Sequence, residues 1–506
     1  MTQAAELIDI TARVWSEVGG PVDRLDSVTT GGPRAVLPSH FDVTGLATAS
    51  VAAATLAAAE FLAARNGAQP RPVTVDSRQA CAAFAAEGLF SPAGWDLPDV
   101  WDPIAGNYPT QDGWIRLHTN YAYHRAVVER LLGAVDRESV RAAVAGWKAE
   151  DLETAVVEAG GCAAAMRTRE DWLAAPAGAA TAGAPLVAVA ERRMPGGTEV
   201  TAGVGLPAGA GGVAGAGGAA GAGAAAGMRP YSGVRVLDLT RVIAGPVGTR
   251  FLAAYGADVL RIDPPGFAEV PALLPETTTG KRTAALDLTT AGGRTTFEGL
   301  VATADVLVTG LRADALARLG YDDGALAALN PALIIASLDA YGWDGPWRDR
   351  RGFDSLVQMS AGIAAAGAAA TGAAVTGTAV TGTAATGADK PVPLPVQALD
   401  HGCGYLIAAA VGRALTRRLT ESTVSRIRAS LIGTANLLWS LPRPGDLGEQ
   451  PPMPKPGDFR LVDTHTAWGP ARRVPLPGEI AGVDPEWRIE AGPLGRHQPT
   501  WTESRR

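Results

Sequence analysis

Cysteine is rare in this chain of 506 residues. The three thiols are Cys81, Cys162 and Cys403, and no two of them form a Cys-x-x-Cys pair. Such spacing excludes a disulfide framework and a cysteine-ligated zinc site, and it favours a reducing compartment. We therefore expect three buried thiols and a cytoplasmic protein.

The chain also has no large excess of charge of either sign. Charged residues make up 19% of the chain and the net charge is -7, which gives no electrostatic attraction to nucleic acid or to an anionic membrane. The first residues, MTQAAELIDITARVW, have acidic residues where a secretory signal has basic ones. Residues 46–64 are rich in weakly apolar alanine and are interrupted by Glu60, so they predict a buried helix rather than a membrane span.

Two segments lack side chains that could build a core. Residues 207–227 are almost entirely glycine and alanine, which is typical of a flexible linker. Residues 364–390 repeat a Thr-Gly step about every five residues and lie just before Asp400. This repeat predicts a mobile loop rather than a helix or a strand.

Regular alternation of strands and helices begins after the first of these segments. Short β-branched runs, typical of strands, occupy residues 234–240, 257–263, 304–310 and 332–338. Helical patterns at 245–256 and 291–304 lie between them, so a parallel sheet with helices on both faces is expected. The turn after the first run lacks the Gly-x-Gly-x-x-Gly fingerprint, which argues against a nicotinamide cofactor.

Four blocks within residues 229–440 occur together in a particular order: VRVLDLTRVIAGPVG, TGKRTAALDL, RRGFDSLVQMSAG and ALDHGCGYLIAAAVGRAL. In sequence and spacing they resemble the family III CoA-transferases, the CaiB/BaiF superfamily. The resemblance implies an α/β fold, with a Rossmann-like parallel-sheet large domain and a smaller α/β domain. It also implies a homodimer that uses coenzyme A, an acyl-CoA and a carboxylic acid, with no metal and no nicotinamide.

The resemblance also assigns site residues. The family's nucleophile, an aspartate after the Gly-Phe-Asp block and a mobile loop, corresponds to Asp400. Its CoA-binding positions correspond to Arg241, Arg261, Lys281 and Arg312. Arginine and lysine suit the phosphates of CoA, although each of these four cations is also explained as a solvated surface charge.

The expected chemistry is covalent. Asp400 would attack an acyl-CoA to give a mixed anhydride, and the released CoA would convert this into an aspartyl-CoA thioester that an acceptor acid then uses in reverse. Gly402 and Gly404, at the start of a helix, are expected to bring amide donors close to the oxyanion. The alternative for Asp400 is an N-cap of that helix.

Neighbouring residues are expected to have supporting roles. We expect His401 to pack locally, and Asp354 and Gln358 to hold the site. Related racemases use a histidine in the block before the mobile loop, where this chain has Phe353, and this difference argues against racemisation. An acyl-CoA racemase or isomerase, and a degenerate member that binds CoA without turnover, stay open as alternatives.

The order of segments differs from that of the family. The family's small domain follows its catalytic helix, but residues 441–506 are short and rich in proline, and we expect them to pack on the large domain. Residues 105–206 resemble the small domain instead, and residues 1–104 resemble the catalytic-helix region, in which Asp42 is expected to be a helix cap. The predicted division is therefore 1–104, 105–206, a linker at 207–228, 229–440 and 441–506. The donor and acceptor acids have no sequence code.

Overall fold

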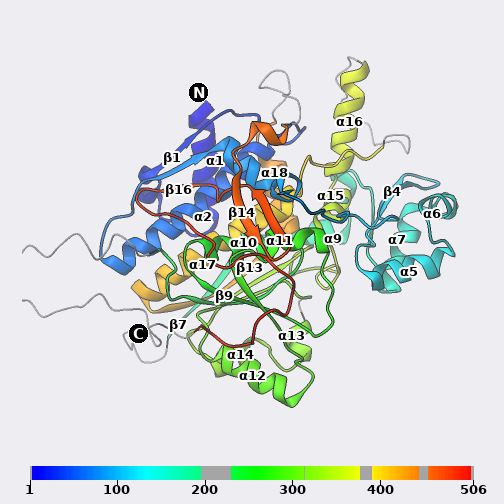
Figure 1. Ribbon diagram of the computed structural model, residues 1–506. Coiled ribbons are helices and arrows are strands. Elements are labelled where there is room, and N and C mark those ends of the chain that lie inside the picture. Colours follow the sequence, from blue (N-terminus) through cyan, green and yellow to red (C-terminus); the bar gives the residue numbers. More distant parts are fainter. Residues whose placement is uncertain (1–2, 195–228, 313, 377–389, 444–453, 503–506) are drawn as a thin grey trace, which may run out of the picture.

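The computed structural model describes residues 3–194, 229–312, 314–376, 390–443 and 454–502 (Figure 1). The linker predicted at 207–228 lies outside the described residues, as do residues 377–389 of the Thr-Gly repeat.

A seven-stranded sheet forms the centre of the molecule. Its strands, in spatial order, are β10 (Lys281–Ala285), β9 (Asp258–Asp263), β8 (Arg235–Leu239), β11 (Val306–Thr309), β12 (Ile334–Asp339), β13 (Thr423–Ser430) and β7 (Val187–Arg193). All neighbours are parallel except β13 and β7. Counted from β8, the six parallel strands have the order 3-2-1-4-5-6 of the Rossmann fold. The α/β class, the parallel sheet and the four predicted strands are confirmed.

Helices cover both faces of this sheet (Figure 1). Because side chains alternate along a strand, Val236 of β8 belongs to one core and Leu237 to the other. The first core includes α10 (Ala244–Ala254) and α17 (Ala398–Glu421), and the second includes α12 (Ala291–Val301) and α14 (Asp323–Leu329). The helices α10 and α12 confirm the two predicted crossover helices.

A second long helix, α2 (Val43–Asn66), packs along α17. Its side chains are mostly alanine, and the segment from Val43 to Ala63 is buried, which confirms the buried helix predicted at 46–64. Among the described residues, α2 is the one helix long and apolar enough to span a membrane, and that stretch is wholly buried in the fold. Asp42 caps α2, as predicted, by accepting the Gly45 N–H at 2.7 Å, and it pairs with Arg34.

A small α/β unit lies to one side of the large sheet (Figure 1). It consists of β4 (Gly106–Pro109), β5 (Trp114–Leu117), β6 (Ala163–Ala165), α5 (Ala122–Leu132), α6 (Arg137–Val144) and α7 (Ala149–Glu158). It has its own core, which includes Tyr108, Ile115 and Leu152. Strand β7 falls within the range predicted for this domain, yet it is the edge strand of the large sheet.

Segments from the two ends of the chain are interleaved. One sheet consists of β1 (Val28–Gly31), β2 (Val73–Asp76) and β16 (Glu479–Ile480), and another of β14 (Val462–Thr466), β15 (Gly469–Arg473) and β3 (Ser91–Pro92). The C-terminal segment also reaches the large sheet, where the Ile489 carbonyl accepts the Gly280 N–H at 2.8 Å. The remaining elements are α1 (Gln3–Glu17), η1 (Val22–Ser27), α3 (Ser77–Phe84), α4 (Ala86–Leu89), α8 (Arg169–Ala174), α9 (Pro176–Thr181), η3 (Pro271–Leu273), α11 (Leu274–Thr277), α13 (Ala315–Arg318), α15 (Asp354–Ser360), α16 (Ile363–Thr376), α18 (Leu431–Ser440) and η5 (Pro456–Asp458).

The helix α16 corrects one prediction. Residues 364–376 belong to the segment expected to be a mobile loop, and they lie in a helix that projects from the body of the protein (Figure 1). Alanine has the highest helix propensity of all residues, and in this half of the repeat it outweighs the glycines and threonines. The Thr-Gly spacing was therefore the weaker signal.

Candidate functional site

Asp400 lies where two cavities meet. It is the third residue of α17 and is only 7% exposed. One cavity, of about 340 Å³, opens beyond the carboxyl ends of β8, β11 and β12, and we call it the cation-lined cavity. The other, of about 530 Å³, lies between α15, α17 and residues of the N-terminal segment, and we call it the apolar cavity. Asp400 lines both of them.

The start of α17 is capped from another helix. The Asp354 Oδ2 on α15 accepts the N–H groups of Leu399 at 2.8 Å and Asp400 at 3.0 Å. The Gln358 amide holds Asp354, and its Oε1 accepts the Leu394 N–H at 2.7 Å. Asp400 is therefore inside the first turn and is not the N-cap, and the geometry matches the holding role expected for Asp354 and Gln358.

The electrostatics of this turn oppose an ionised Asp400. Burial raises its pKa well above the usual value, and the carboxylates of Asp354 and Glu87 raise it further. Burial also raises the pKa of Asp354 to about 6. No hydrogen bond reaches the Asp400 carboxylate from the residues that the structure describes. A carboxylate in this setting is poorly hydrated and basic, and both properties favour nucleophilic attack once the proton has left.

His401 faces away from this chemistry. Its Nε2 lies 3.0 Å from Glu87 Oε2, and its ring stacks on Phe84 with centroids 5.2 Å apart. The side chain is fully buried. This arrangement matches the local packing expected from the sequence.

The two glycines after Asp400 are close-packing positions. A Cβ on Gly402 would lie 2.9 Å from Thr434 Cγ2, and one on Gly404 would lie 2.4 Å from the Ala244 carbonyl oxygen. Both residues are past the first four of the helix, so their N–H groups bond to carbonyls within α17. Close packing alone therefore accounts for glycine at both positions. The predicted role of their N–H groups as donors to an oxyanion gains no support from the geometry.

The cation-lined cavity brings Asp400 together with five arginines. Two of them, Arg241 and Arg312, were predicted to contact CoA. The Arg241 guanidinium stacks on Phe267 at 3.9 Å and its Nε lies 3.8 Å from Asp263 Oδ1. The cavity lies outside the strand ends where the sheet order reverses, between β8 and β11, which is where open α/β sheets bind their ligands.

The other two predicted cations are enclosed in the protein. Arg261 Nε lies 2.8 Å from Asp263 Oδ2, and its Nη2 lies 3.1 Å from Glu269 Oε2. Lys281 Nζ lies 3.0 Å from Asp238 Oδ2, and burial lowers the pKa of this lysine to about 8. Neither side chain lines either cavity, so the expected direct contact with CoA has no support in the geometry and both cations act within the sheet.

Comparison with known proteins gives a family match for part of the chain. The sequence model of CoA-transferase family III matches residues 231–442. Over these residues the chain is similar to CoA-transferase family III. The matched family III domain contains Asp400, Arg241 and Arg312.

Three curated relatives share part of this domain. The CoA-transferase/lyase DddD of Marinomonas sp. (strain MWYL1) is 31% identical over 40% of this chain and 23% of its own. The probable fatty acyl-CoA transferase Rv3272 of Mycobacterium tuberculosis is 29% identical over 40% of this chain and 50% of its own. The succinate–glutarate CoA-transferase of Agrobacterium fabrum is 36% identical over 25% of this chain and 36% of its own. The chain thus spans half or less of the length of these relatives.

Among solved structures, one of Rv3272 from Mycobacterium tuberculosis superposes with a TM-score of 0.34. It is 30% identical and covers 41% of this chain and 56% of that one. The fold assignment above rests on the sheet itself.

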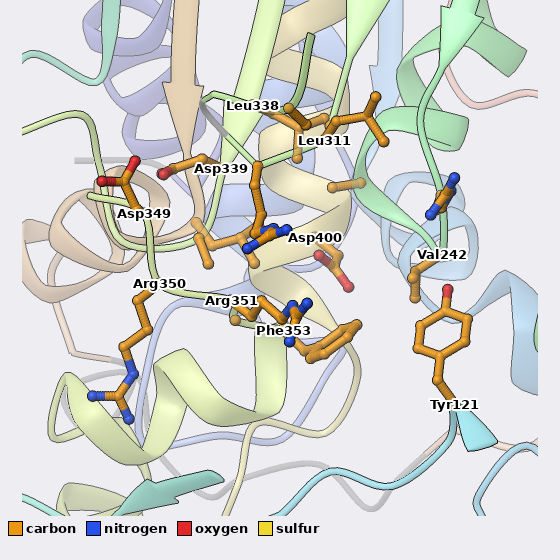
Figure 2. Close-up of a pocket in the computed structure, with 18 of the residues that line it drawn as sticks. Tyr121, Val242, Leu311, Leu338, Asp339, Asp349, Arg350, Arg351, Phe353 and Asp400 are labelled. Atoms are coloured by element: carbon orange, nitrogen blue, oxygen red, sulfur yellow. The ribbon is translucent and has the colours of Figure 1, made fainter. Parts of the chain in front are cut away.

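Several residues that reach the candidate site were not predicted from the sequence. Arg348, Arg350 and Arg351 line the cation-lined cavity directly before the Gly-Phe-Asp block. Three basic residues in four positions were a visible signal. Figure 2 shows the Asp400 carboxylate between Arg351 and Phe353 on one side and Val242 and Tyr121 on the other, while Arg350 extends away.

Tyr121 and Val242 are joined by a buried carboxylate. Val242 has φ of 62°, an uncommon conformation for a β-branched residue, and its N–H donates to Glu269 Oε2 at 2.9 Å. The Glu269 Oε1 accepts the Tyr121 hydroxyl at 2.7 Å. Arg261 pairs with the same carboxylate, so this internal cation helps to hold the strained turn beside Asp400. No local sequence pattern could show a contact between residues so far apart in the chain.

Proposed function

We propose that this chain is a CoA-transferase that moves CoA from an acyl-CoA to a carboxylic acid, with Asp400 as the covalent nucleophile. The observation that carries the proposal is the position of Asp400 between a cavity lined by arginines and an apolar cavity. Arginines suit the phosphates of CoA, and an apolar cavity suits an acyl group. The family match of residues 231–442 supports this class of reaction.

The reaction proceeds through two kinds of covalent intermediate on Asp400, an aspartyl-acyl anhydride and an aspartyl-CoA thioester. The carboxylate attacks the thioester carbon, the C–S bond breaks, and CoA leaves as a thiolate from an aspartyl-acyl anhydride. The thiolate attacks the aspartyl carbonyl carbon and releases the donor acid, which leaves an aspartyl-CoA thioester. The acceptor carboxylate then displaces the thiolate, and the thiolate attacks the acceptor's carbonyl carbon to give the new acyl-CoA and free Asp400. The overall reaction converts one thioester into another of similar energy, and the enzyme carboxylate divides it into reversible acyl transfers.

Trapping the intermediate tests this proposal. Hydroxylamine added during incubation with an acyl-CoA should convert Asp400 into its hydroxamate, which peptide mass spectrometry detects. The Asp400→Asn variant should give no hydroxamate at this position. Transfer accompanied by modification of a different carboxylate, or of none, would overturn the role of Asp400.

Removing Arg241 or Arg312, the two predicted cations that line the cation-lined cavity, should weaken CoA binding. Arg241→Ala and Arg312→Ala should each raise the dissociation constant of CoA roughly tenfold or more, because a hydrogen bond to a charged group contributes about 1.5–3 kcal/mol. Isothermal titration calorimetry measures this change. Arg488→Ala is the matched control, since it removes an equal charge from an exposed residue that borders neither cavity. Unchanged affinity in both cavity variants would reject this site for CoA.

CoA binding should also weaken as the pH rises through about 8. Burial raises the pKa of Asp339, which lines the cation-lined cavity, to about 8. The side chain is thus neutral below that pH and becomes an anion facing the phosphates above it, so affinity should fall several-fold between pH 7 and 9. In Asp339→Asn the fall in CoA affinity between pH 7 and 9 should be smaller. Titration of CoA itself affects both proteins equally, so the difference between their two pH profiles reports on Asp339. Equal pH dependence by calorimetry would contradict this prediction.

A second candidate function is proton exchange at the α-carbon of an acyl-CoA. The sequence argued against it because Phe353 replaces an imidazole, but His118 stacks flat on Phe353, with centroids 3.7 Å apart, and lines the apolar cavity with Asp400. Burial lowers the pKa of His118 well below its ordinary value, so the ring is a neutral base. Its buried Nδ1 has no hydrogen-bond partner within the described part of the chain.

Deuterium exchange decides this second candidate. With a 2-methylacyl-CoA in heavy water, the protein should incorporate deuterium at the α-carbon, and His118→Gln should lose that activity. No incorporation by the unaltered protein would reject the candidate and leave CoA transfer unaffected.

The proposed enzyme is a cytoplasmic homodimer that uses CoA, an acyl-CoA and a carboxylic acid, with no metal and no nicotinamide. The family resemblance supports the dimer, and the composition supports the location. Light scattering of the purified protein tests the assembly, and a monomeric mass would reject it.

A further inference from the structure

The apolar cavity is built largely by residues outside the family III match. Its walls include Leu37, Phe84, Leu89, Trp101 and His118 from the N-terminal part of the chain, and Phe459 from the C-terminal part. Its volume of about 530 Å³ lies within the range of pockets that hold drug-sized ligands. The cavity is therefore much larger than a formyl or acetyl group needs, and its shape depends on residues outside the matched domain as well as on the domain itself.

The charges on these walls have one sign. The ionisable side chains are the carboxyl groups of Asp354, Asp400 and Glu87, together with His118. Among the described residues, no arginine or lysine lines this cavity. His401, the partner of Glu87, is itself fully buried and does not line the cavity. The uncharged polar side chains on the walls are Asn120, Ser355 and Gln397. A second carboxylate carried into this space by a ligand would therefore find no cation to neutralise it among the described lining residues, and the ionisable groups that it meets are three carboxyl groups and a neutral imidazole.

An acyl group bound to Asp400 extends into one of the two cavities. The cation-lined cavity holds the arginines that suit the phosphates of CoA, so the apolar cavity is left for the acyl chain. Burying an unpaired carboxylate is strongly unfavourable, whereas burying methylene or aryl groups is favourable.

We propose that the acyl group is that of an apolar monocarboxylic acid, either an aliphatic acid of medium length or an arylacetic acid, and not that of a dicarboxylic acid. This inference rests on the proposed CoA transfer, because it names the acyl groups that the transferase would accept. The N-terminal segment is then the part of the chain that determines acyl specificity, with Trp101 as one wall. The Trp101 ring lies edge-on to His118, with centroids 5.9 Å apart. The Arg116 guanidinium lies over the face of the Trp101 ring, 4.7 Å from its centroid.

Isotope exchange tests the substrate class one acid at a time. Each acyl-CoA is incubated with the ¹³C-labelled form of its own acid, so that every exchange is isoenergetic. Hexanoyl-CoA and phenylacetyl-CoA should exchange with kcat/KM at least tenfold above succinyl-CoA and oxalyl-CoA. Exchange of either dicarboxylic acyl group at an equal or higher rate would overturn the inference.

Binding separates this inference from the proposed reaction. By calorimetry, hexanoyl-CoA should bind at least tenfold more tightly than CoA, and succinyl-CoA should not. If no acid exchanges but this order of affinities holds, the transferase proposal fails and the assignment of the cavity stands. If hexanoyl-CoA binds no more tightly than CoA, the assignment fails whatever the activity.

A matched pair of variants ties the preference to the cavity. Trp101→Ala should reduce the advantage of hexanoyl-CoA over CoA severalfold without changing the affinity for CoA itself. Trp468→Ala removes another tryptophan that borders neither cavity, and it should leave both affinities unchanged. An equal effect of the two substitutions would reject Trp101 as a wall of the acyl site.

Discussion

Replacing Asp400 by asparagine should lower the rate of CoA transfer at least a thousandfold and leave the fold intact. A neutral amide cannot attack the thioester, and a thousandfold loss corresponds to about 4 kcal/mol of transition-state stabilisation. Asparagine keeps the size of the side chain, and the carboxylate accepts no hydrogen bond from any residue that the structure describes, so the substitution breaks no contact of that kind. Steady-state kinetics and circular dichroism of both proteins provide the measurement.

The comparable acid on the neighbouring helix provides the control. Asp42 lies at the start of α2, lines neither cavity, and keeps a capping amide oxygen when it is changed to asparagine. Asp42→Asn should transfer CoA at the normal rate per folded molecule, although it loses the charge that pairs with Arg34. Near-normal transfer by Asp400→Asn with any accepted substrate would contradict the mechanism.

The pH dependence of stability gives a second readout at Asp400. Its pKa is raised in the folded protein, so folding takes up a proton when the pH lies between the unfolded and the folded pKa. The contribution of Asp400 to the free energy of unfolding therefore falls as the pH rises through that window. The asparagine variant should lack this contribution, and its stability relative to the unaltered protein should improve towards neutral pH.

Breaking the ion pair between α2 and α17 should cost about 3–5 kcal/mol of unfolding free energy. The Glu60 carboxylate pairs with Arg413 across the two helices, and both side chains are less than a tenth exposed. In Glu60→Leu the guanidinium keeps its bond to the Gly19 carbonyl at 2.9 Å but loses its counter-charge. Urea denaturation measures the loss.

The double variant Glu60→Leu/Arg413→Leu distinguishes an unpaired charge from lost packing. Arg24, the second partner of Glu60 at 3.7 Å, is partly exposed and keeps Asp23 at 3.5 Å. Because the double variant removes both charges of the buried pair, it should recover most of the stability lost in the single variant. A single variant within 1 kcal/mol of the unaltered protein, or a double variant that is less stable than the single one, would show that the pair does not hold the helices together.

The sequence predicted those elements whose signal is local. The runs at 234–240 and 332–338 became β8 and β12 because β-branched residues buried on both faces form parallel strands. Asp400 was predicted because it stands in a family block; it lines both cavities, and its catalytic role stays a prediction. The helix α16 was not predicted because the repeat of Thr-Gly steps was given more weight than the high alanine content.

Long-range contacts account for the rest. Arg261 and Lys281 were expected to contact CoA because they stand at the family's CoA-binding positions, but the carboxylates of Asp263, Glu269 and Asp238 enclose them, and no sequence pattern links these partners. His118 lies far from Phe353 in the chain, so the stacking of the two rings depends on the tertiary fold. The arginines before Phe353 form a basic cluster that is visible in the sequence, and they could have been predicted as site residues.

The pairing of α2 with α17 has a consequence for synthesis on the ribosome. About 330 residues separate the end of α2 from the start of α17, and at about 5–20 residues per second roughly 15–65 s pass before the partner helix emerges. During that time a 24-residue helix that is buried in the finished protein has an uncovered apolar surface. The nascent chain therefore needs a temporary cover, such as a chaperone, and expression should be more sensitive to chaperone supply than the stability of the folded protein suggests.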